Sequence, residues 1–437
     1  MWKETRITLI LAGPIIVGQV SQMLMGLTDT VMIGRVGPVP LAASAFAGTI
    51  YGLFFVVGIG LLLPVAVMVA RARGAGDPGS CAQFLRHGTA MAVGFGLLET
   101  ALMLIIGQHL ERFGQPPEVV AEAGTYFTLI ALSIVPTLLF QVFRQFAESL
   151  GHPRLPMMVL LGGVAANAGL NWLFIYGNWG VPALGLAGAG WATLISRCLI
   201  VGVIMVWLSG DVRFRDYWPE AWGVSLSGER MKSMLRIGLP AAGQLLFESG
   251  AFSAAAVMIG WLGTVPLAAH QIAITCAAIT FMFLLGLSMA VSMRVAQAVG
   301  AGERHRLRPI GFGALAAGTL LMSAFALLFS FGAHPIAALF VEDTAVIEVA
   351  ARLLMVAGIF QIFDGGQVVG SGALRGLTDV TVPTLITFIA YWVVALPGGY
   401  ALGIYGPYGS VGIWVALACG LAFAALFLAA RFVRLTR

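Results

Sequence analysis

Long apolar segments alternate with short polar or Gly- and Pro-containing stretches along the whole chain. Most of the apolar segments reach the about 20 residues that one membrane-crossing helix requires. Divided at charged residues and at Pro or Gly, the pattern predicts twelve membrane spans. The predicted spans are 9–32, 41–69, 88–108, 123–143, 155–177, 186–208, 236–261, 266–292, 309–331, 349–370, 380–403 and 409–430.

The composition agrees with a chain that lies almost wholly in a membrane. Of its 437 residues, 59% are hydrophobic and 10% are charged, whereas soluble globular domains contain about 25% charged residues. A soluble fold is therefore excluded. The four cysteines are scattered singly, so neither a disulfide framework nor a structural metal site is indicated, and no cofactor is expected.

Basic residues distinguish the two sides of the predicted membrane protein. Both termini and the connections after the even-numbered spans carry nearly all Lys and Arg residues, and the opposite side carries only Arg35, Arg112 and Arg352. Because cationic loops resist translocation, both termini are predicted to be cytoplasmic, in a multi-pass protein of the cell inner (plasma) membrane. The net charge of +5 is not gathered into one basic run, so no nucleic-acid partner is expected.

The two halves of the chain are copies of each other. Segments 32–43 and 258–269 agree at nine of twelve positions with an offset of 226, and segments 65–77 and 291–303 agree at seven of thirteen with the same offset. Six spans per half is an even number, so the halves have the same orientation and a pseudo-twofold axis along the membrane normal. Parallel repeats of this kind build transporters.

The expected fold class is therefore an all-α membrane protein with twelve transmembrane helices in two parallel six-helix lobes. The N-terminal lobe is expected to cover 1–208 and the C-terminal lobe 236–437. The polar segment 209–235 between them is expected to be a cytoplasmic linker.

Three carboxylates inside the predicted spans depart from the repeat. Shifted by 226 residues, Asp29 corresponds to an Ala, Glu248 to a Gln and Asp364 to a Leu. An ionisable residue at membrane depth is expensive, so each of the three is a functional-site hypothesis. Structural alternatives stay open: a helix-end role for Asp29, a hydrogen-bonding role for Glu248 and a packing role for Asp364.

Other polar or aromatic residues share helix faces with these acids. Gln19 and Gln22 accompany Asp29, Phe252 accompanies Glu248, Phe360 and Gln367 accompany Asp364, and the fifth span adds Asn167 and Asn171. A pair between the buried Glu99 and Arg197 is left open. Burial favours a protonated carboxyl group and a nearby cation favours the ionised one, so a proton, sodium and an organic cation can compete for one acid. Such competition is sufficient for an exchanger.

Several segments match a known family. They are GQ at 18–19, DTVMIGRVG at 29–37, GLPAAGQ at 238–244, FESGAFSAAAVMIGWLG at 247–263, PLAAHQIA at 266–273 and GALRGLTDVTVP at 372–383. With them, essentially the whole chain resembles the multidrug and toxic compound extrusion (MATE) transporters, NorM-like branch. The resemblance implies a two-lobe antiporter, not an enzyme, which expels cationic amphipathic drugs against inward H⁺ or Na⁺ by alternating access.

The resemblance also implies roles for individual residues. Those implied to form a cation-binding cluster, able to hold Na⁺, are Asp29, Asn167, Asn171 and Thr193. Glu248 and Asp364 resemble coupling carboxylates of the C-terminal lobe. Residues implied to contact or attract the substrate are Gln22, Phe252, Gln271, Phe360, Glu342 and Asp343. Some sodium exporters of the family have Tyr at the position of Phe360. Phe360 lacks the hydroxyl oxygen of that Tyr, which favours proton coupling or a sodium site in the N-terminal lobe alone.

Other functions receive less support from the residues. Loop 70–80 lacks the charged Asp-Arg motif of major-facilitator transporters. A lipid or lipid-linked precursor flippase of related fold is the alternative, but it would need Arg for phosphate groups, and the buried charges here are mainly acidic. No H-E-x-x-H or G-x-S-x-G motif indicates an enzyme. The expected partners are small organic cations and membrane lipid, and the protein is expected to be a monomer.

Overall fold

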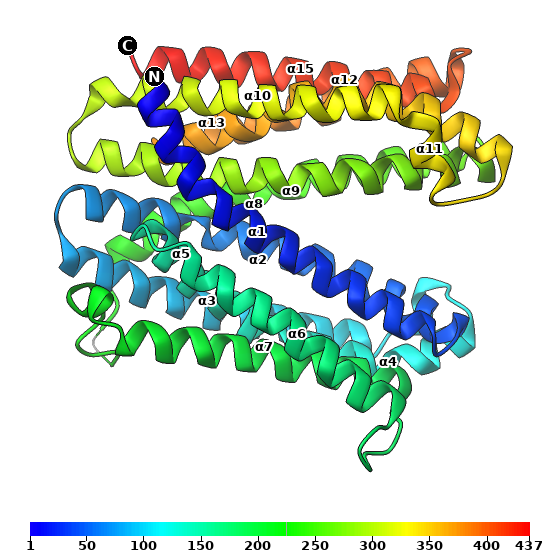
Figure 1. Cartoon of the computed structure of the whole chain (residues 1–437), viewed down its shortest axis with the longest axis horizontal. Coiled ribbons are helices and arrows are strands. Elements are labelled where there is room, and N and C mark those ends of the chain that lie inside the picture. Colours follow the sequence, from blue (N-terminus) through cyan, green and yellow to red (C-terminus); the bar gives the residue numbers. More distant parts are fainter. Residues whose placement is uncertain (224) are drawn as a thin grey trace. The chain divides into compact units, whose positions relative to one another are not determined.

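The computed structural model describes residues 1–223 and 225–437. Within these residues, twelve helical stretches are long and apolar enough to cross a membrane, which confirms the predicted number (Figure 1). They are α1 (Trp2–Gly34), α2 (Pro38–Gly74), α3 (Pro78–Gly107), α4 with α5 (Pro117–Leu132 and Ile134–Ser149), α6 (Arg154–Tyr176), α7 (Gly185–Gly210), α8 (Gly228–Gly260), α9 (Thr264–Gly300), η3 with α10 (Arg304–Arg306 and Leu307–Phe331), α12 (Thr344–Gly376), the run from α13 to η5, and α15 (Gly409–Leu435).

The eleventh stretch departs from regular α-helix. It consists of α13 (Thr381–Phe388), the π-helical η4 (Ile389–Ala395), α14 (Leu396–Gly399) and the π-helical η5 (Tyr400–Tyr405). Pro397 has no N–H to donate, and its ring crowds the carbonyl four residues earlier, so a regular hydrogen-bond ladder cannot pass through it. Wider π turns around the proline are the local consequence, and such turns often mark functional positions. The short connecting elements are η1 (Leu110–Phe113), η2 (Val212–Tyr217) and α11 (Ala333–Ala338).

The helices pack into two compact units. One unit is Val17–Ala242, and the other combines Met1–Ile16 with Gly243–Arg437. The chain therefore passes from one unit to the other inside α1 and inside α8, at points that the sequence offset of 226 relates to each other. We call Val17–Ala242 the N-unit and the remainder the C-unit. The lobes 1–208 and 236–437 and the linker 209–235 stay predictions based on the repeat.

Prolines lie close to both crossing points. Pro14 is inside α1 and Pro240 is inside α8, and the same offset relates them. A proline in a helix interior removes one backbone hydrogen bond and bends the helix. The repeat thus places a weakened turn just before each helix enters its second unit.

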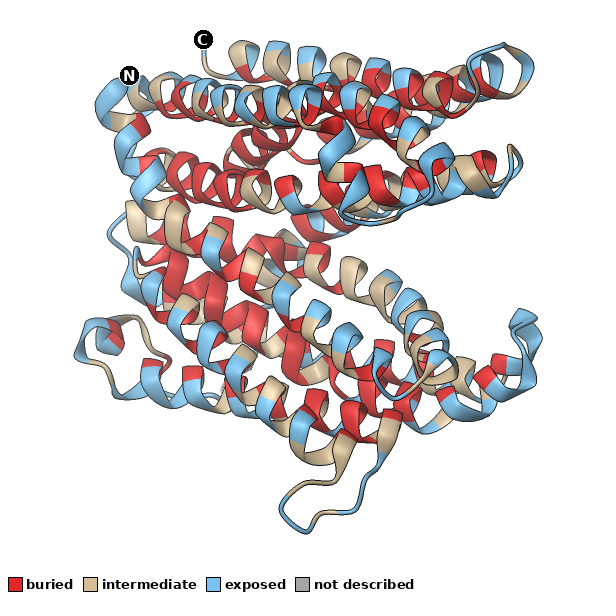
Figure 2. Cartoon of the chain, turned by 45° about the vertical axis from the view of Figure 1, so that its right-hand side comes forward, coloured by how far each residue is buried: buried red, intermediate tan, exposed pale blue. Residues whose placement is uncertain are grey.

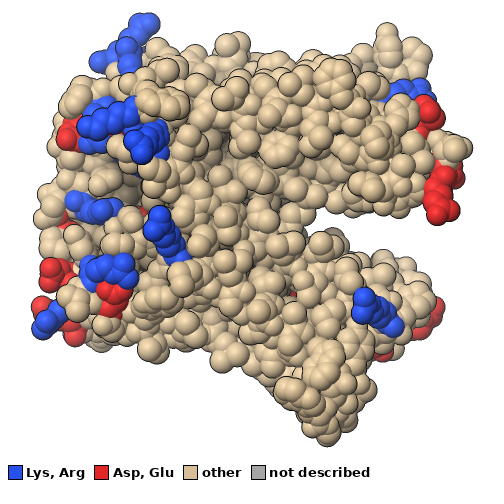
Figure 3. Space-filling view, in the orientation of Figure 1, with Lys and Arg blue, Asp and Glu red and all other residues tan. Residues whose placement is uncertain are grey.

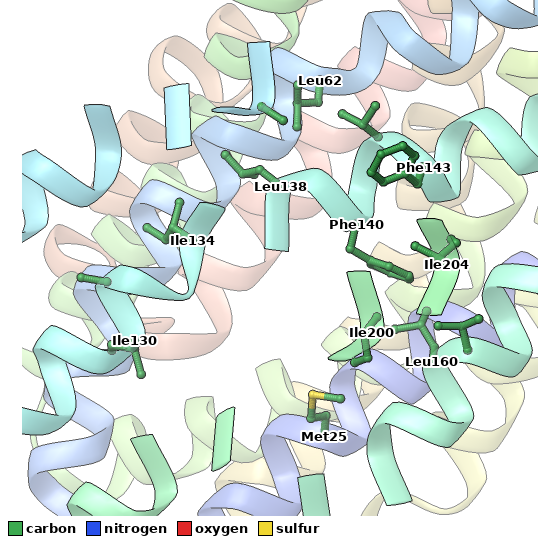
Figure 4. Packing of buried hydrophobic residues seen from close by; sticks show 14 of the residues in the cluster. Met25, Leu62, Ile130, Ile134, Leu138, Phe140, Phe143, Leu160, Ile200 and Ile204 are labelled. Carbon is green, nitrogen blue, oxygen red and sulfur yellow. The ribbon is translucent and has the colours of Figure 1, made fainter. Parts of the chain in front are cut away.

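The N-unit has a core of interlocked apolar side chains. Figure 4 shows Phe140 of α5 directed toward Ile200 and Ile204 of α7, with Leu160 of α6 and Met25 of α1 in the same cluster. Figure 2 shows that buried residues line the inner faces of the helices, with exposed residues on the outer faces. The inner faces also enclose the polar side chains described below.

The C-unit is organised around α12, which packs against α9, α10 and α15. Small residues allow the close approach of α12 and α9, because a Cβ added to Gly372 would lie 2.4 Å from Ser288 Oγ. Ser288 Oγ instead donates a hydrogen bond of 2.7 Å to the Val368 carbonyl. Trp414 of α15 and Tyr391 of η4 are fully buried in the same core.

Charged side chains gather toward the helix ends. On the face shown in Figure 3, Lys, Arg, Asp and Glu lie mainly at the two ends of the helices of each unit, and the long sides between them are uncharged. An uncharged belt of this kind is what a hydrocarbon layer about 30 Å thick requires. The chain is a multi-pass membrane protein.

Candidate functional site

The N-unit brings together four of the predicted site residues. Asn171 Nδ2 donates hydrogen bonds to Asp29 Oδ1 at 2.5 Å and to Asn167 Oδ1 at 3.2 Å, and Thr193 Oγ1 donates to Asp29 Oδ2 at 3.5 Å. The residues come from α1, α6 and α7, and Asn167 and Asn171 share a face because they are four positions apart. We call Asp29, Asn167, Asn171 and Thr193 the Asp29 cluster.

The Asp29 cluster retains unused hydrogen-bonding capacity. Among the described residues, buried Asn171 Oδ1 and Asn167 Nδ2 have no hydrogen-bond partner. Buried polar atoms without partners are rare, and each calls for an explanation. Carboxylate, amide and hydroxyl oxygens are hard ligands that suit a small cation, and the carboxylate also suits a protonated amine. The cluster therefore has the chemistry of a cation site.

The buried acid Glu99 and the half-buried Arg197 do not pair. Arg197 Nη1 donates to Tyr51 Oη and to Ser133 Oγ, each at 2.6 Å, and its guanidinium lies 4.7 Å from the centre of the Tyr51 ring. Glu99 Oε2 has no hydrogen-bond partner within the described chain. Arg197 lies one helical turn after Thr193 on α7, so its positive charge acts on the Asp29 carboxylate. The Asp29 cluster thus has a resident counter-ion.

The acceptor for Arg197 lies at a helix break. Pro136 has no N–H for the Leu132 carbonyl, and α4 gives way to α5 at Ser133, whose hydroxyl accepts from Arg197. Thr100 Oγ1 donates to the nearby Ala131 carbonyl at 3.0 Å. The sequence pattern predicted an unbroken span at 123–143, so this polar contact was not foreseen.

The C-unit holds the second acidic group. Gln367 Nε2 donates to Glu248 Oε2 at 3.5 Å, and the Tyr391 hydroxyl donates to Gln367 Oε1 at 3.2 Å. Asp364 is close enough to Glu248 for the two carboxylates to repel each other when both are ionised. All four side chains are buried. We call Glu248, Asp364, Gln367 and Tyr391 the Glu248 cluster.

Aromatic rings pack beside the Glu248 cluster. The Phe252 ring lies edge-on to Phe360 and to Tyr391, with centroids 6.0 Å and 5.7 Å apart. Phe360 also contacts Trp414, whose Nε1 donates to His270 Nδ1 at 3.1 Å. The rings form a continuous wall along one side of the carboxylates.

The residues predicted to contact substrate are spread over different environments. Phe360 is only 2% exposed and belongs to the aromatic wall. Asp343 caps α12, because its side chain accepts hydrogen bonds from the backbone N–H groups of Ala345 and Val346. Gln271 and Glu342 are exposed and lie in neither cluster, whereas Gln22 and Phe252 are half-buried. The sequence therefore identified the buried acids, but it did not show which of the predicted substrate contacts pack in the core.

The sequence reasoning missed two members of the Glu248 cluster as site residues. Gln367 was recognised only as sharing a helix face with Asp364, and Tyr391 was not singled out at all. The signal for Tyr391 was a hydroxyl-bearing aromatic near the middle of the apolar span 380–403, which also contains Tyr400. Within the described residues, no three His, Cys, Asp or Glu side chains are grouped so that they could hold a metal ion.

Two repeated helical units in a membrane, each with enclosed acidic and amide groups, have the construction of a membrane transporter. Comparison with known families gives a narrower class. The chain belongs to the MatE family of membrane transporters, whose family model matches residues 14–173 and 240–401. The two matches start at Pro14 and Pro240, in agreement with the repeat.

Similarity to individual proteins extends along the whole chain. It is 38% identical to the probable multidrug resistance protein NorM of Rhodopseudomonas palustris, over 100% of this chain and 93% of the relative. It is 35% identical to the corresponding protein of Mesorhizobium japonicum, over 100% and 95%, and 35% identical to the multidrug resistance protein NorM of Burkholderia vietnamiensis, over 97% and 92%.

Solved structures share the fold at lower identity. A structure described as the outward-facing conformation of a multidrug resistance MATE family transporter of the MOP superfamily has a TM-score of 0.91 and 21% identity, over 99% of this chain and 96% of that one. A MOP superfamily transporter from Pyrococcus furiosus has a TM-score of 0.90 and 21% identity, over 99% and 97%. These similarities support the all-helical, twelve-span fold.

Proposed function

We propose that the protein is a secondary active multidrug exporter, which expels cationic amphipathic compounds in exchange for inward H⁺ or Na⁺ by alternating access. The relatives named as multidrug resistance proteins support the class of activity. The observation that carries the proposal is the Glu248 cluster, in which two buried carboxylates are close enough to repel each other and Glu248 accepts a hydrogen bond from the neutral Gln367.

The Glu248 cluster is the proposed coupling group. Two adjacent carboxylates in a dry environment cannot both carry a negative charge at low cost. Binding of a proton or of a cationic substrate relieves their repulsion. The two ligands therefore compete for the same negative charge, and entry of one favours release of the other.

The Asp29 cluster is the proposed cation site of the N-unit. Asn171 and Thr193 hold the Asp29 carboxylate in one orientation, while Asn171 Oδ1 is free to face a ligand. Sodium or the ammonium group of a drug would meet oxygen atoms there. This arrangement supports a site that binds a cation.

The wider proposal follows the predicted topology and partners. Both termini are proposed to be cytoplasmic in the inner membrane, with a monomer as the transporting species and no cofactor. Gln22, Phe252 and Gln271 expose surface and are kept as substrate contacts, and Glu342 is kept as an acid at the outer mouth. The acidic character of both clusters favours a cationic cargo over the phosphate groups that a lipid-linked precursor flippase would handle.

Transport by the purified protein in liposomes tests the proposal. Uptake of the fluorescent cation ethidium under an imposed pH gradient is expected to fall to the protein-free rate in Glu248→Gln and in Asp364→Asn. The matched control is Glu348→Gln, because Glu348 is an exposed acid on α12, the helix that carries Asp364. Wild-type rates in both Glu248→Gln and Asp364→Asn, with the protein present in the vesicles, would refute the proposed coupling.

A further inference from the structure

The hydroxyl of Tyr391 reaches Glu248 through one intermediate side chain. Tyr391 is fully buried in the π-helical η4, and its hydroxyl contacts Gln367, which in turn contacts Glu248. These contacts join η4, α12 and α8 within the C-unit. The three groups form a linear chain that ends on one carboxylate oxygen.

Both hydrogen bonds in the series from Tyr391 through Gln367 to Glu248 can exchange donor and acceptor. A tyrosine hydroxyl and a carboxamide can each donate and accept, whereas a carboxyl group donates only when it is protonated. When Glu248 is ionised, Tyr391 donates to Gln367 Oε1 and Gln367 Nε2 donates to Glu248. When Glu248 is protonated, its O–H can donate to Gln367 Oε1 after the amide turns over, and Gln367 Nε2 then donates to Tyr391.

We propose that Gln367 and Tyr391 are positioning residues that form a reversible hydrogen-bond switch serving both protonation states of Glu248. The proposal rests on the function proposed above and deepens it. In each state the same two contacts are made, with donor and acceptor exchanged in both. The proton that binds is carried by Glu248, and it leaves from the same oxygen when the amide turns back.

The geometry leaves room for this movement. The Gln367 to Glu248 contact is 3.5 Å, at the long end of hydrogen-bond distances. The tyrosine ring, in contrast, is held on its side by the Phe252 ring at 5.7 Å. We therefore expect the Gln367 amide to rotate while the Tyr391 hydroxyl stays in place.

Tyr391 lies on the buried face of its span. It follows Thr387 of α13 by four positions and both are fully buried, so helical periodicity directs Tyr391 into the C-unit core. Its neighbour Trp392 is exposed and donates to the Phe247 carbonyl at 3.0 Å. The π turns of η4 start close to Tyr391 and shift the side chains that follow it.

Other charged groups also act on Glu248. Asp364 of α12 repels its negative charge, and Arg375 at the end of α12 attracts it. The Tyr391 hydroxyl faces it from η4, and His270 of α9 is engaged with Trp414. Of these groups, the Tyr391 hydroxyl alone has a hydrogen bond to the Gln367 amide among the described residues, and it belongs to the switch itself.

The switch favours a proton over sodium at this cluster. With the hydroxyl donating to Oε1, the amide presents N–H groups to Glu248, and N–H groups repel a metal cation. A sodium ion would require the amide oxygen and other oxygens to converge on it, as hard cations do. We therefore expect the C-unit to exchange protons and any sodium dependence to arise elsewhere.

The test is the pH profile of ethidium transport by the full-length protein in liposomes, with the pH difference across the membrane held constant. In Gln367→Met, the ionised carboxylate loses its donor, so the half-maximal pH is expected to move upward by about one unit. In Tyr391→Phe, the amide is no longer held and donates less well, so a shift of about half a unit in the same direction is expected. The double variant is expected to match Gln367→Met, because Tyr391 acts through Gln367.

Tyr400→Phe is the matched control, since Tyr400 lies in the second π segment of the same span and contacts Tyr405 instead. Its profile is expected to match wild type. Infrared difference spectra of the carboxyl C=O band provide a readout independent of transport. The pH at which that band titrates is expected to shift in Tyr391→Phe, which tests the switch even if the Gln367→Met protein cannot be produced. Unchanged profiles and spectra, or additive shifts in the double variant, would overturn the switch.

The outcomes separate this inference from the proposed function. If Glu248→Gln is inactive but Tyr391→Phe and Gln367→Met titrate as wild type, the switch is wrong and the exporter stands. If Glu248→Gln transports at the wild-type rate, the proposed coupling is wrong, and the infrared titration still decides whether the switch exists.

Discussion

The N-unit and the C-unit enclose acids in different ways. In the N-unit a single half-buried carboxylate, Asp29, is held by Asn171 and Thr193 and lies under the influence of Arg197. In the C-unit two buried carboxylates, Glu248 and Asp364, repel each other, Glu248 accepts from Gln367, and Arg375 is the cation that acts on Glu248. The duplicated scaffold thus holds a single acid in one candidate site and an acid pair in the other, and we propose cation binding for the first and proton exchange for the second.

Buried polar anchors occur in both units. The N-unit contains an ion pair between fully buried Arg144 and Glu148 at 2.7 Å, and Arg144 Nη1 also donates to Gln19 Oε1 at 2.8 Å. In the C-unit, Gln244 makes neutral hydrogen bonds to Ser371 and Thr387, at 2.9 Å and 3.3 Å, and Arg294 pairs with Glu4. Both units thus use ion pairs, and the pair of the N-unit is the more deeply buried one.

Moving the acid to its repeat-related position gives the largest expected effect. Gln22 occupies the position that corresponds to Glu248. The double variant Gln22→Glu with Glu248→Gln is expected to show no transport above the protein-free rate, because Leu138 and Ala165 occupy the positions that correspond to Asp364 and Tyr391. Ethidium transport in liposomes measures this. Recovery of activity would mean that the two units are interchangeable and would break the comparison.

Breaking the N-unit ion pair is expected to cost stability. Arg144→Met leaves the buried Glu148 charge without its partner, for which about 3–5 kcal/mol of destabilisation is expected. Thermal unfolding of the detergent-solubilised protein, followed by circular dichroism, measures the change. Arg213→Met is the control, since the Arg213 pair with Asp211 is exposed, and little change is expected there. Equal unfolding temperatures for both variants would show that the N-unit does not rely on fixed charge.

Neutralising Asp29 is expected to weaken cation binding. Asp29→Asn keeps the hydrogen-bonding shape but removes the charge, so the ethidium concentration for half-maximal transport is expected to rise about tenfold, which corresponds to about 1.4 kcal/mol. The maximal rate under a pH gradient is expected to stay within about twofold, since the coupling acids are untouched. A loss of maximal rate with unchanged half-maximal concentration would assign Asp29 to coupling and remove the distinction between the units.

The smallest expected effect concerns two helix starts that the repeat relates. Asp77 caps α3 by accepting from Ser80 N at 2.9 Å, whereas its counterpart Glu303 pairs with Arg306 and caps no helix. Asp77→Ala is expected to cost about 1 kcal/mol of unfolding free energy, and Glu303→Ala less. Thermal unfolding of both variants checks this order, and the reverse order would contradict the assigned cap.

The Asp77 effect should also depend on pH. Hydrogen bonds from Ser80 hold the pKa of the Asp77 carboxyl below its usual range. A carboxyl with a lowered pKa in the folded state stabilises the fold above its unfolded-state pKa and loses this contribution as the pH falls through the folded value. The difference between wild type and Asp77→Ala is therefore expected to be constant near neutral pH and to vanish in strong acid.

The sequence predicted the parts of the structure that depend on hydropathy and charge. The twelve spans follow from apolar length, and the structure confirms them. Asp29, Asn167 and Asn171 were grouped by the resemblance, and they are in contact. These residues could be recognised from the sequence because a polar residue stands out in an apolar segment.

Features that depend on local deviations from helical geometry were not predicted. The break at Ser133 arises because Pro136 removes one hydrogen bond, and it gives Arg197 a partner other than Glu99. The contact of Tyr391 with Gln367 joins two different spans, so spacing within one span could not predict it. Phe360 was expected to face a substrate but packs in the core, because spacing identifies a face and not what covers it.

Transport under one gradient at a time tests the central claim most directly. Liposomes containing the wild-type protein or Glu248→Gln are loaded so that either a pH gradient or a sodium gradient is the only driving force. The account predicts ethidium transport by the wild type under the pH gradient, none by Glu248→Gln, and little by either under sodium alone. Full-rate transport driven by sodium alone and unaffected by Glu248→Gln would contradict it.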